Sequence, residues 1–297
     1  MSLREKALEM HRRRGGKIAV ESKVPMQKAE DLSLAYTPGV AEPCLEIAAN
    51  PASVYEYTAK GNMVAIVTDG TAVLGLGDIG PEAALPVMEG KALLFKAFAG
   101  VDAFPVCLRT TDTNKIVETI KYLEPVYGGV NLEDIAAPRC FEIENRLRRE
   151  LSIPVFHDDQ HGTAIVVLAA LRNALRVVGK DLARARILIN GGGAAGTAIA
   201  RLLLAVGAGE VMICGRHGAF CAGDPDLNAT KQALAAVTNP RQIKGCLAEI
   251  IAGQDVFIGV SAPQLLTAEM VRRMAPGAVV LAMANPVPEI WPEDARA

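Results

Sequence analysis

A glycine-rich turn between a strand pattern and a helix pattern constrains this chain more than any other feature. The apolar run Ile187–Asn190 precedes it, and a helical pattern over residues 194–206 follows it. The turn itself reads Gly191, Gly192, Gly193, Ala194, Ala195 and Gly196. In a Gly-x-Gly-x-x-Gly turn the glycines allow a tight bend, close approach of a pyrophosphate and close helix–strand packing. We therefore predict a dinucleotide site at the start of this helix, the alternative being a tight turn that holds no nucleotide.

The rest of the chain alternates strand-like and helical patterns, which is typical of an α/β fold with a mostly parallel sheet. Its 297 residues are enough for two domains. We predict an N-terminal α/β catalytic domain over residues 1–160, followed by a Rossmann-type dinucleotide-binding domain over residues 161–297. The predicted strands are Met63–Thr68, Ala103–Leu108, Ile187–Asn190, Val211–Cys214, Val256–Val260 and Ala278–Ala284. The predicted helices cover residues 81–99, 112–123, 139–150, 162–178 and 194–206.

A second Gly-x-Gly-x-x-Gly match runs from Gly75 to Gly80, but its surroundings differ. The strand pattern before it is short, Ala72–Leu74, and acidic residues lie on the helix that Pro81 opens. Those acids would repel a phosphate. We therefore predict a structural turn that lines a pocket.

Composition and charge exclude several classes of protein. The formal net charge is −2, whereas a chain that neutralises nucleic-acid phosphates is usually more basic. Six cysteines occur without a Cys-x-x-Cys pair, which suits a reducing compartment. The N-terminus is charged, and no apolar run reaches the ~18 residues that span a bilayer. We expect a cytoplasmic protein with no nucleic-acid or membrane partner.

The segment after the second strand of the nucleotide domain bears on which dinucleotide binds. An acid normally ends this strand and bonds the ribose 2′-hydroxyl of NAD. Here Gly215 takes that place, and Arg216 and His217 follow it. A cation next to a position that lacks the usual acid favours binding of a ribose 2′-phosphate. We therefore predict NADP with Arg216 in its site, with NAD as the alternative.

Two side chains before residue 160 are suited to proton transfer. Tyr36 places a phenol just ahead of the rigid turn at Pro38, although by itself it could be an ordinary loop tyrosine. Lys91 lies on the apolar stripe of the helix over 81–99, so it points into the core or into a cleft. Desolvation would lower the pKa of such a lysine and allow it to act as a general base near neutral pH. The alternative is a lysine that reaches water from the helix edge, and Lys96 is the weaker candidate.

Carboxylates cluster at two points, Glu133-Asp134 and Asp158-Asp159. Acids at the ends of strands suit a hard cation such as Mg²⁺ or Mn²⁺. Their alternative role, for Asp158 or Asp159, is to cap the helix that follows. The histidines His157 and His161 are four residues apart, which could instead suggest zinc, but they lie at a strand-to-helix junction.

Taken together, these features resemble the malic enzyme family in its shorter prokaryotic type. The matching stretches follow one another in order over nearly the whole chain. They are residues 31–41, 68–70 with 74–78, 86–91, 131–134, 156–163 and the glycine turn at 191–196.

The resemblance implies oxidative decarboxylation of L-malate to pyruvate and CO₂ by a homodimer, with NADP or NAD and with Mg²⁺ or Mn²⁺. By motif match, Tyr36 is similar to the general acid, and Lys91 to the general base that contacts the substrate. Asp158 is similar to a neighbour that bonds the lysine, and Asn285 to a substrate contact at the end of a strand. The implied metal ligands are Glu133, Asp134 and Asp159.

The sequence departs from the family pattern in two places. Larger malic enzymes carry an arginine that grips the malate carboxylate, and the matching position here is Ala72. The chain also ends soon after the fourth strand of the nucleotide domain, whereas a six-stranded doubly wound sheet needs more. We expect either a trimmed domain or a missing tail.

Two other functions stay open at this point. One is a malolactic type of malate converter that retains its NAD, and net formation of NADPH would separate it from a malic enzyme. The other is a non-catalytic nucleotide sensor, which would have no need for Lys91, Tyr36 and the acids together.

Overall fold

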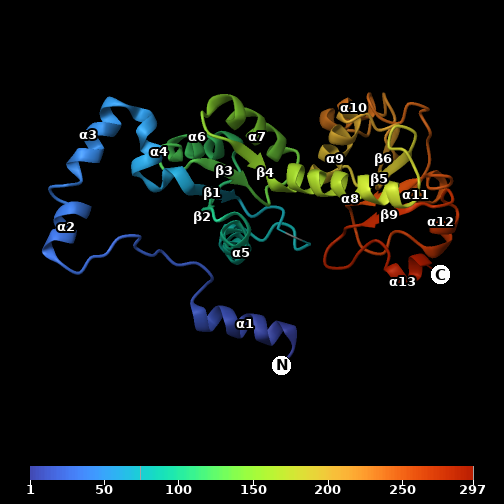
Figure 1. Cartoon of the computed structure of the whole chain (residues 1–297). Coiled ribbons are helices and arrows are strands. Elements are labelled where there is room, and N and C mark those ends of the chain that lie inside the picture. The colour runs from blue at the N-terminus through green and yellow to red at the C-terminus, as the bar shows by residue number, and fades with distance from the viewer. Residues whose placement is uncertain (74, 297) are drawn as a thin grey trace. The chain divides into compact units, whose positions relative to one another are not determined.

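The protein is described by a computed structural model that covers residues 1–73 and 75–296. It divides into two compact units, each with its own sheet (Figure 1). The first unit comprises Met1–Ile135 and Ile143–Phe156, and the second comprises Ala136–Glu142 and His157–Ala297. The predicted α/β class is confirmed. None of the helices in the described residues is long and apolar enough to cross a membrane.

The sheet of the first unit has the strand order β2-β1-β3-β4. Its strands are β1 (Met63–Thr68), β2 (Asp102–Cys107), β3 (Gly129–Leu132) and β4 (Val155–His157). β1 pairs in parallel with β2 and with β3, and Val64 lies opposite both Ala103 and Gly129. Because the strands are parallel, their carboxyl ends meet at one edge of the sheet. The strand predicted at 63–68 is confirmed, whereas β3 and β4 are too short to be found from the sequence pattern.

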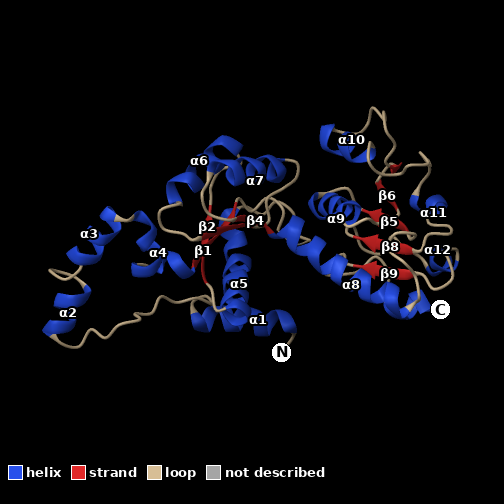
Figure 2. Ribbon diagram, turned by 45° about the horizontal axis from the view of Figure 1, so that its top comes forward, coloured by secondary structure: helices blue, strands red, loops and turns tan. Residues whose placement is uncertain are grey.

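Three helices accompany this sheet. They are α5 (Pro81–Ala99), α6 (Thr113–Leu123) and α7 (Arg139–Glu150). α5 lies on one side of the sheet, while α6 and α7 lie on the other (Figures 1 and 2). The buried side chains of Met88 and Ala92 pack against Ile66 of β1. All three helices fall within one residue of their predicted bounds.

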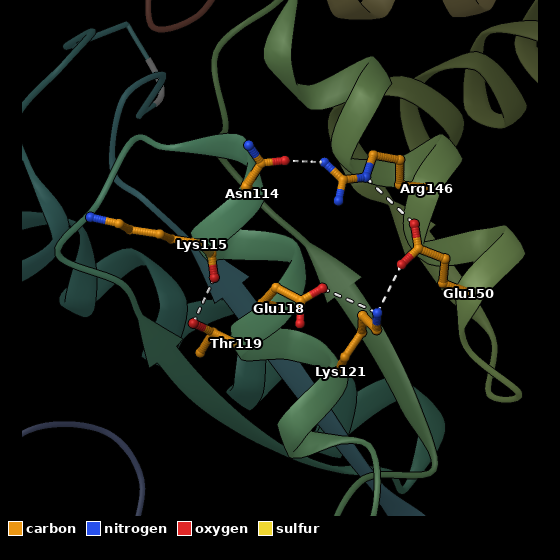
Figure 3. A network of polar contacts seen from close by, with 7 residues as sticks. All are labelled: Asn114, Lys115, Glu118, Thr119, Lys121, Arg146 and Glu150. Carbon is orange, nitrogen blue, oxygen red and sulfur yellow. Dashed lines mark hydrogen bonds and ion pairs between the residues drawn. The ribbon is translucent and has the colours of Figure 1, made fainter.

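A polar network joins α6 to α7 (Figure 3). The guanidinium of Arg146 donates to the Asn114 side chain at 2.7 Å. Lys121 bridges Glu118 on its own helix, at 3.1 Å, and Glu150 on α7, at 3.0 Å. These exposed pairs contribute little energy individually, so they orient two helices that buried residues hold together.

The N-terminal arm, residues 1–58, contains helices that the sequence analysis did not predict. They are α1 (Leu3–Arg14), α2 (Ala29–Ala35), α3 (Ala41–Ala49), α4 (Val54–Tyr57) and a 3₁₀ turn at Pro51–Ser53. A second 3₁₀ turn, Ala59–Asn62, follows the arm. None of the helices α1 to α4 contains a buried residue. In both views α2 and α3 lie away from the sheet (Figures 1 and 2). They could not be predicted because they lack the apolar stripe of a helix that packs on a core.

The second unit has a five-stranded sheet in the order β7-β6-β5-β8-β9. Its strands are β5 (Arg186–Asn190), β6 (Glu210–Gly215), β7 (Gly218–Ala219), β8 (Val256–Gly259) and β9 (Val279–Ala282). β5, β6, β8 and β9 are parallel, and only β7, a hairpin partner of β6, is antiparallel. Alternate residues of β5 point to opposite faces, so Ile187 and Ile189 join one buried cluster and Leu188 joins the other.

The helices of the second unit cover both faces of this sheet (Figure 2). α8 (Thr163–Val177) and α9 (Ala194–Ala205) pack on one face, while α11 (Leu247–Ile250) and α12 (Ala268–Arg272) pack on the other. The remaining helices are α10 (Ala229–Ala235) and α13 (Pro292–Arg296). The predicted strand at 278–284 is shorter than expected, because β9 ends at Ala282 and the next residues form a loop.

Asp255 anchors the start of this parallel sheet. Its carboxylate accepts hydrogen bonds from Lys180 Nζ at 2.8 Å and from the backbone N–H of Arg186 at 2.9 Å. Burial alone raises the pKa of Asp255, but these hydrogen bonds outweigh it and the pKa is lowered. Because the folded pKa lies below the unfolded value, the carboxylate stabilises the fold above about pH 4 and this contribution is lost as the pH falls further.

We expect Asp255→Asn to lower the free energy of unfolding of the second unit by about 1–2 kcal/mol at pH 7, since one charged acceptor is lost. The difference from the wild type should shrink as the pH falls below about 4. Denaturant unfolding at several pH values measures both effects. Asp181→Asn, an exposed acid in the turn before β5, is the control. A loss of stability that does not depend on pH would contradict the assignment.

Candidate active site

Lys91 extends from α5 toward a buried carboxylate. Its Nζ lies 3.1 Å from Oε1 of Glu133, and the two side chains are 22% and 6% exposed. The helix is placed by a tight turn after β1, where a Cβ on Gly70 would lie 2.3 Å from the carbonyl oxygen of Gly80. α5 begins at the next residue, Pro81. The ammonium group therefore meets an acid at a strand end, and the alternative of a lysine that reaches only water does not hold.

Glu133 and Asp134 follow directly after β3 at the carboxyl edge of the sheet. The N–H of Glu133 donates to the carbonyl of Val67 at 2.9 Å, which continues the sheet hydrogen bonding for one residue. The Asn131 amide donates to Glu133 Oε2 at 2.8 Å. Asp134 is buried with a left-handed backbone, φ 54°, and its carbonyl accepts the N–H of Ala72 at 3.0 Å. Both acids are thus held by backbone contacts that the sequence pattern alone could not reveal.

The acids Asp158 and Asp159 lie in a single π-helical turn, Asp158–Gly162, between β4 and α8. This turn was not predicted. The residues at the N-caps of the turn and of α8 are His157 and Gly162, and neither makes a side-chain cap bond. Neither acid is thus the N-cap residue of this turn or of α8. A Cβ on Gly162 would lie 2.3 Å from Asp158 Oδ1, so the glycine leaves room for that carboxylate.

Three of the predicted acids form a group that can hold a metal ion. Glu133, Asp134 and Asp159 each offer a carboxylate oxygen, and these oxygens lie within 4.8 Å of one another. It is the one such group among the described residues, and neither His157 nor His161 belongs to it. Oxygen ligands suit Mg²⁺ and Mn²⁺, whereas zinc sites generally contain histidine or cysteine. The donor set therefore fits the predicted hard cation and not the zinc alternative.

His157 lies beside one carboxylate of this group, that of Asp159. The ring is fully buried, with Nδ1 2.8 Å from the amide nitrogen of Gln160 and Nε2 3.1 Å from Asp159 Oδ2. It lies where second-layer groups commonly orient a metal-ligating carboxylate. Sequence reasoning considered His157 only as a zinc ligand, and it did not single out Asn131, although both lie within matching stretches.

Tyr36 does not lie beside Lys91 in this chain. It is the C-cap residue of α2, and it is 65% exposed. In both views α2 lies away from α5 (Figures 1 and 2). The structure therefore brings Lys91 together with the acids but leaves the predicted general acid on the arm.

The predicted dinucleotide turn joins β5 to α9 as expected. Gly191 has φ 126°, and a Cβ there would lie 2.6 Å from the carbonyl oxygen of Val260. A Cβ on Gly196 would lie 1.8 Å from the carbonyl oxygen of Gly191. Gly193 is the N-cap of α9, and a Cβ there would meet open space. The first and last glycines are thus required by the bend and the packing, and the middle one leaves the helix N-terminus accessible to an anion.

A pocket of about 340 Å³ lies beyond the end of β6 in the second unit. Its lining includes Arg216, the predicted contact, and also His217 and Lys231. Lys231 comes from α10, with Nζ 5.6 Å from the centre of the Phe220 ring. Acids also line the pocket, Asp224 and Asp226. Lys231 was missed because it comes 15 positions after Arg216 in the sequence, on a separate helix.

Asn285 lies in the loop after β9. It is exposed and precedes Pro286 in a cis peptide bond. The prediction placed it at the carboxyl end of a strand, and the structure puts it three residues beyond that end. It therefore occupies the edge where doubly wound sheets bind their ligands.

Comparison with known proteins identifies the family. The family model described as "Malic enzyme, N-terminal domain" matches residues 15–148, and "Malic enzyme, NAD binding domain" matches residues 160–296. The "Bifunctional malic/malolactic enzyme" of Bacillus subtilis (strain 168) is 59% identical over 297 residues, 100% of this chain and 72% of that protein.

The names of two further relatives contain different dinucleotides. The "NADP-dependent malic enzyme" of Escherichia coli (strain K12) is 48% identical over 99% of this chain, which spans 39% of that protein. A crystal structure of the NAD-dependent malic enzyme from Thermotoga maritima has a TM-score of 0.95 and 50% identity, covering 98% of this chain and 78% of that one. By both of its domains and along its whole length, this chain belongs to the malic enzyme family.

Proposed function

We propose that the chain catalyses the oxidative decarboxylation of L-malate to pyruvate and CO₂, with reduction of NADP and dependence on Mg²⁺ or Mn²⁺. The contact between Lys91 Nζ and Glu133, at 3.1 Å, carries the proposal. This contact places a candidate base next to one of the three acids that can hold a cation. A nucleotide sensor would have no need for this pairing.

Lys91 and Tyr36, both of the first unit, supply the proton transfers. Lys91 accepts the hydroxyl proton of malate as C2 is oxidised. Asp158 holds the lysine, and Tyr36 returns a proton to C3 of the enolate that remains after CO₂ leaves. Asn285 binds the substrate from the loop after β9. The dinucleotide, when bound, accepts the hydride from C2.

The acidic group is the metal site of this proposal. Glu133, Asp134 and Asp159 would hold the cation, and the burial of the first two limits competition from water. A divalent cation bound there would supply a Lewis acid that polarises the C2 oxygen. Asn131 keeps Glu133 oriented through its hydrogen bond at 2.8 Å, and Nε2 of His157 lies 3.1 Å from Asp159 Oδ2.

The pocket beyond β6 supports NADP over NAD. Gly215 leaves the end of β6 without the acid that would bond a ribose 2′-hydroxyl. Arg216, His217 and Lys231 instead line one cavity, where a 2′-phosphate would meet two permanent cations. Asp224 and Asp226 partly offset this charge, so NAD remains the competing nucleotide in the assay.

One assay tests the reaction, the metal and the nucleotide. The chain is incubated with L-malate, with NADP or NAD, and with Mn²⁺, Mg²⁺ or a chelator. We expect pyruvate and NADPH in equal amounts, loss of both in the chelator, and recovery on adding Mn²⁺. An absence of malate-dependent nucleotide reduction under all conditions would refute the proposal. A catalytic efficiency at least tenfold better with NAD would overturn the choice of NADP.

The same incubations also test for a second activity, the malolactic reaction. The Bacillus subtilis relative is named as a bifunctional malic/malolactic enzyme. A malolactic reaction would form lactate and CO₂ with no net NADPH. Lactate is therefore quantified beside pyruvate, and lactate without net NADPH would favour the malolactic reading.

We infer that the chain forms a homodimer in the cytoplasm. The arm supports the dimer, because at α2 and α3 it exposes apolar side chains that the described residues of one chain leave uncovered. They are Leu32, Leu34, Val40 and Leu45. Six free cysteines suit a reducing compartment. Sedimentation of the wild type and of Leu34→Asp tests the dimer, since a monomeric wild type would refute it.

A further inference from the structure

Glu289 is a buried acid that the proposed reaction does not use. It follows β9 by seven residues, and it is 0% exposed. Its Oε1 accepts the backbone N–H of Ser261 at 3.1 Å, and Oε2 accepts that of Ala284 at 3.0 Å. No lysine, arginine or histidine in the described part of the chain forms an ion pair with it. A buried carboxylate is costly unless it is hydrogen-bonded, so these two bonds account for its presence.

The two donors lie beyond the ends of neighbouring strands. Ser261 follows β8 and Ala284 follows β9, and these strands are paired in parallel with Gly259 opposite Ala282. A Cβ on Gly259 would lie 2.3 Å from Cδ of Glu289. The carboxylate therefore fills the space of the missing side chain and joins the two strand ends.

The same bonds connect two parts of the proposed site. The Ser261 hydroxyl accepts a hydrogen bond at 2.9 Å from the side chain of Asn190, the residue before the glycine turn. Ala284 directly precedes Asn285. One carboxylate thus lies between the turn that binds the dinucleotide and the loop that bears the substrate contact.

We propose that Glu289 is a positioning residue that fixes the Asn285 loop relative to the dinucleotide turn. The proposal rests on the proposed function for the role of Asn285. A carboxylate offers an acceptor to each of the two N–H groups, whereas a carboxamide offers one acceptor and one donor. In Glu289→Gln one N–H must therefore face another donor, and the loop shifts. A misplacement of about 1 Å at a site can cost about 10²-fold in rate.

The test compares Glu289→Gln with Glu249→Gln. Glu249 also accepts a backbone N–H, from Cys246 at 2.7 Å, but it is on α11 at the other end of β8. For Glu289→Gln we expect kcat with malate to fall about tenfold to a hundredfold. The Kd for NADPH should change less than about threefold, because Gly191 is held separately by its bond to Cys214 at 2.9 Å. Glu249→Gln should behave as the wild type.

A double-mutant cycle shows whether Glu289 acts through Asn285. When Glu289→Gln is added to Asn285→Ala, kcat should fall less than about threefold relative to Asn285→Ala alone. Gly259→Ala, which pushes the carboxylate aside, should reproduce the effect of Glu289→Gln. A fully additive cycle, an unchanged kcat, or a nucleotide affinity that falls in parallel with kcat would overturn the proposal.

Hydrogen exchange separates this inference from the reaction itself. In Glu289→Gln the amides of Ser261 and Ala284 should exchange faster than in the wild type, and in Glu249→Gln they should not. A wild type that never turns over malate would refute the proposed function. The exchange rates of the two amides would still show whether Glu289 holds the two strand ends together. Unchanged exchange at both amides would overturn the positioning role of Glu289 even in a fully active enzyme.

Discussion

Replacing Lys91 by alanine should lower kcat for malate oxidation about 10³-fold, which is within the range for loss of a general base. The variant removes the ammonium group that lies 3.1 Å from Oε1 of Glu133. Steady-state formation of NADPH measures the effect. Turnover close to that of the wild type would refute the role.

Two further variants make the result specific. Lys96→Ala removes another lysine of α5, one that pairs with Asp102 at 2.6 Å and is 61% exposed, and it should leave turnover unchanged. Lys91→Arg keeps a cation beside Glu133, but a guanidinium does not deprotonate near neutral pH. If Lys91→Arg is nearly as inactive as Lys91→Ala, proton transfer and not charge pairing explains the loss. If it is fully active, the charge alone matters.

Tyr36→Phe should slow pyruvate formation about 10²-fold while slowing the reduction of oxaloacetate far less. In the proposed reaction the phenol protonates C3, and reduction of oxaloacetate at C2 does not include that step. The two rates are measured separately, by pyruvate released from malate and by NADPH consumed with oxaloacetate. Tyr57→Phe, an exposed tyrosine on the same arm, is the control. An equal loss in both rates would argue against Tyr36 as the proton donor.

The two inactive variants can also be mixed. In one chain α2, whose C-cap residue is Tyr36, lies away from α5 (Figure 1). A dimer formed from one Lys91→Ala chain and one Tyr36→Phe chain has an intact pair only if the tyrosine serves the lysine of the other copy. Recovery of pyruvate formation on mixing would assign it to the other copy, and no recovery would assign it to the same chain.

The sequence predicted those parts of the fold that have strong periodicity. β1, α5 and the strand–turn–helix at Gly191 carry apolar patterns long enough to be read, and all were predicted within one residue. β3 and β4 are only four and three residues long, and their pattern is lost among polar neighbours. The arm was missed because it has no buried face.

The site was predictable in its residue types but not in its geometry. The residue pattern suggested Lys91 and the acids Glu133 and Asp134, yet the contact of Lys91 with Glu133 depends on the turn at Gly70 and on the place of β3 beside β1. The left-handed backbone of Asp134 and the π-helical turn at Asp158 have no local sequence signature. Glu289 was invisible for the same reason, since its partners are backbone groups 28 and 5 residues away.

The arm without buried residues has a thermodynamic consequence. The helices α2 and α3, which contain no buried residue, gain little hydrophobic free energy when one copy folds alone, so in the proposed dimer their order would come from association. The arm's contribution to stability then depends on protein concentration by mass action. At concentrations below the dimer dissociation constant, the two sheets would keep their cores while Tyr36 lost its defined place. Dilution would therefore lower the activity of the chain while both sheets stayed folded.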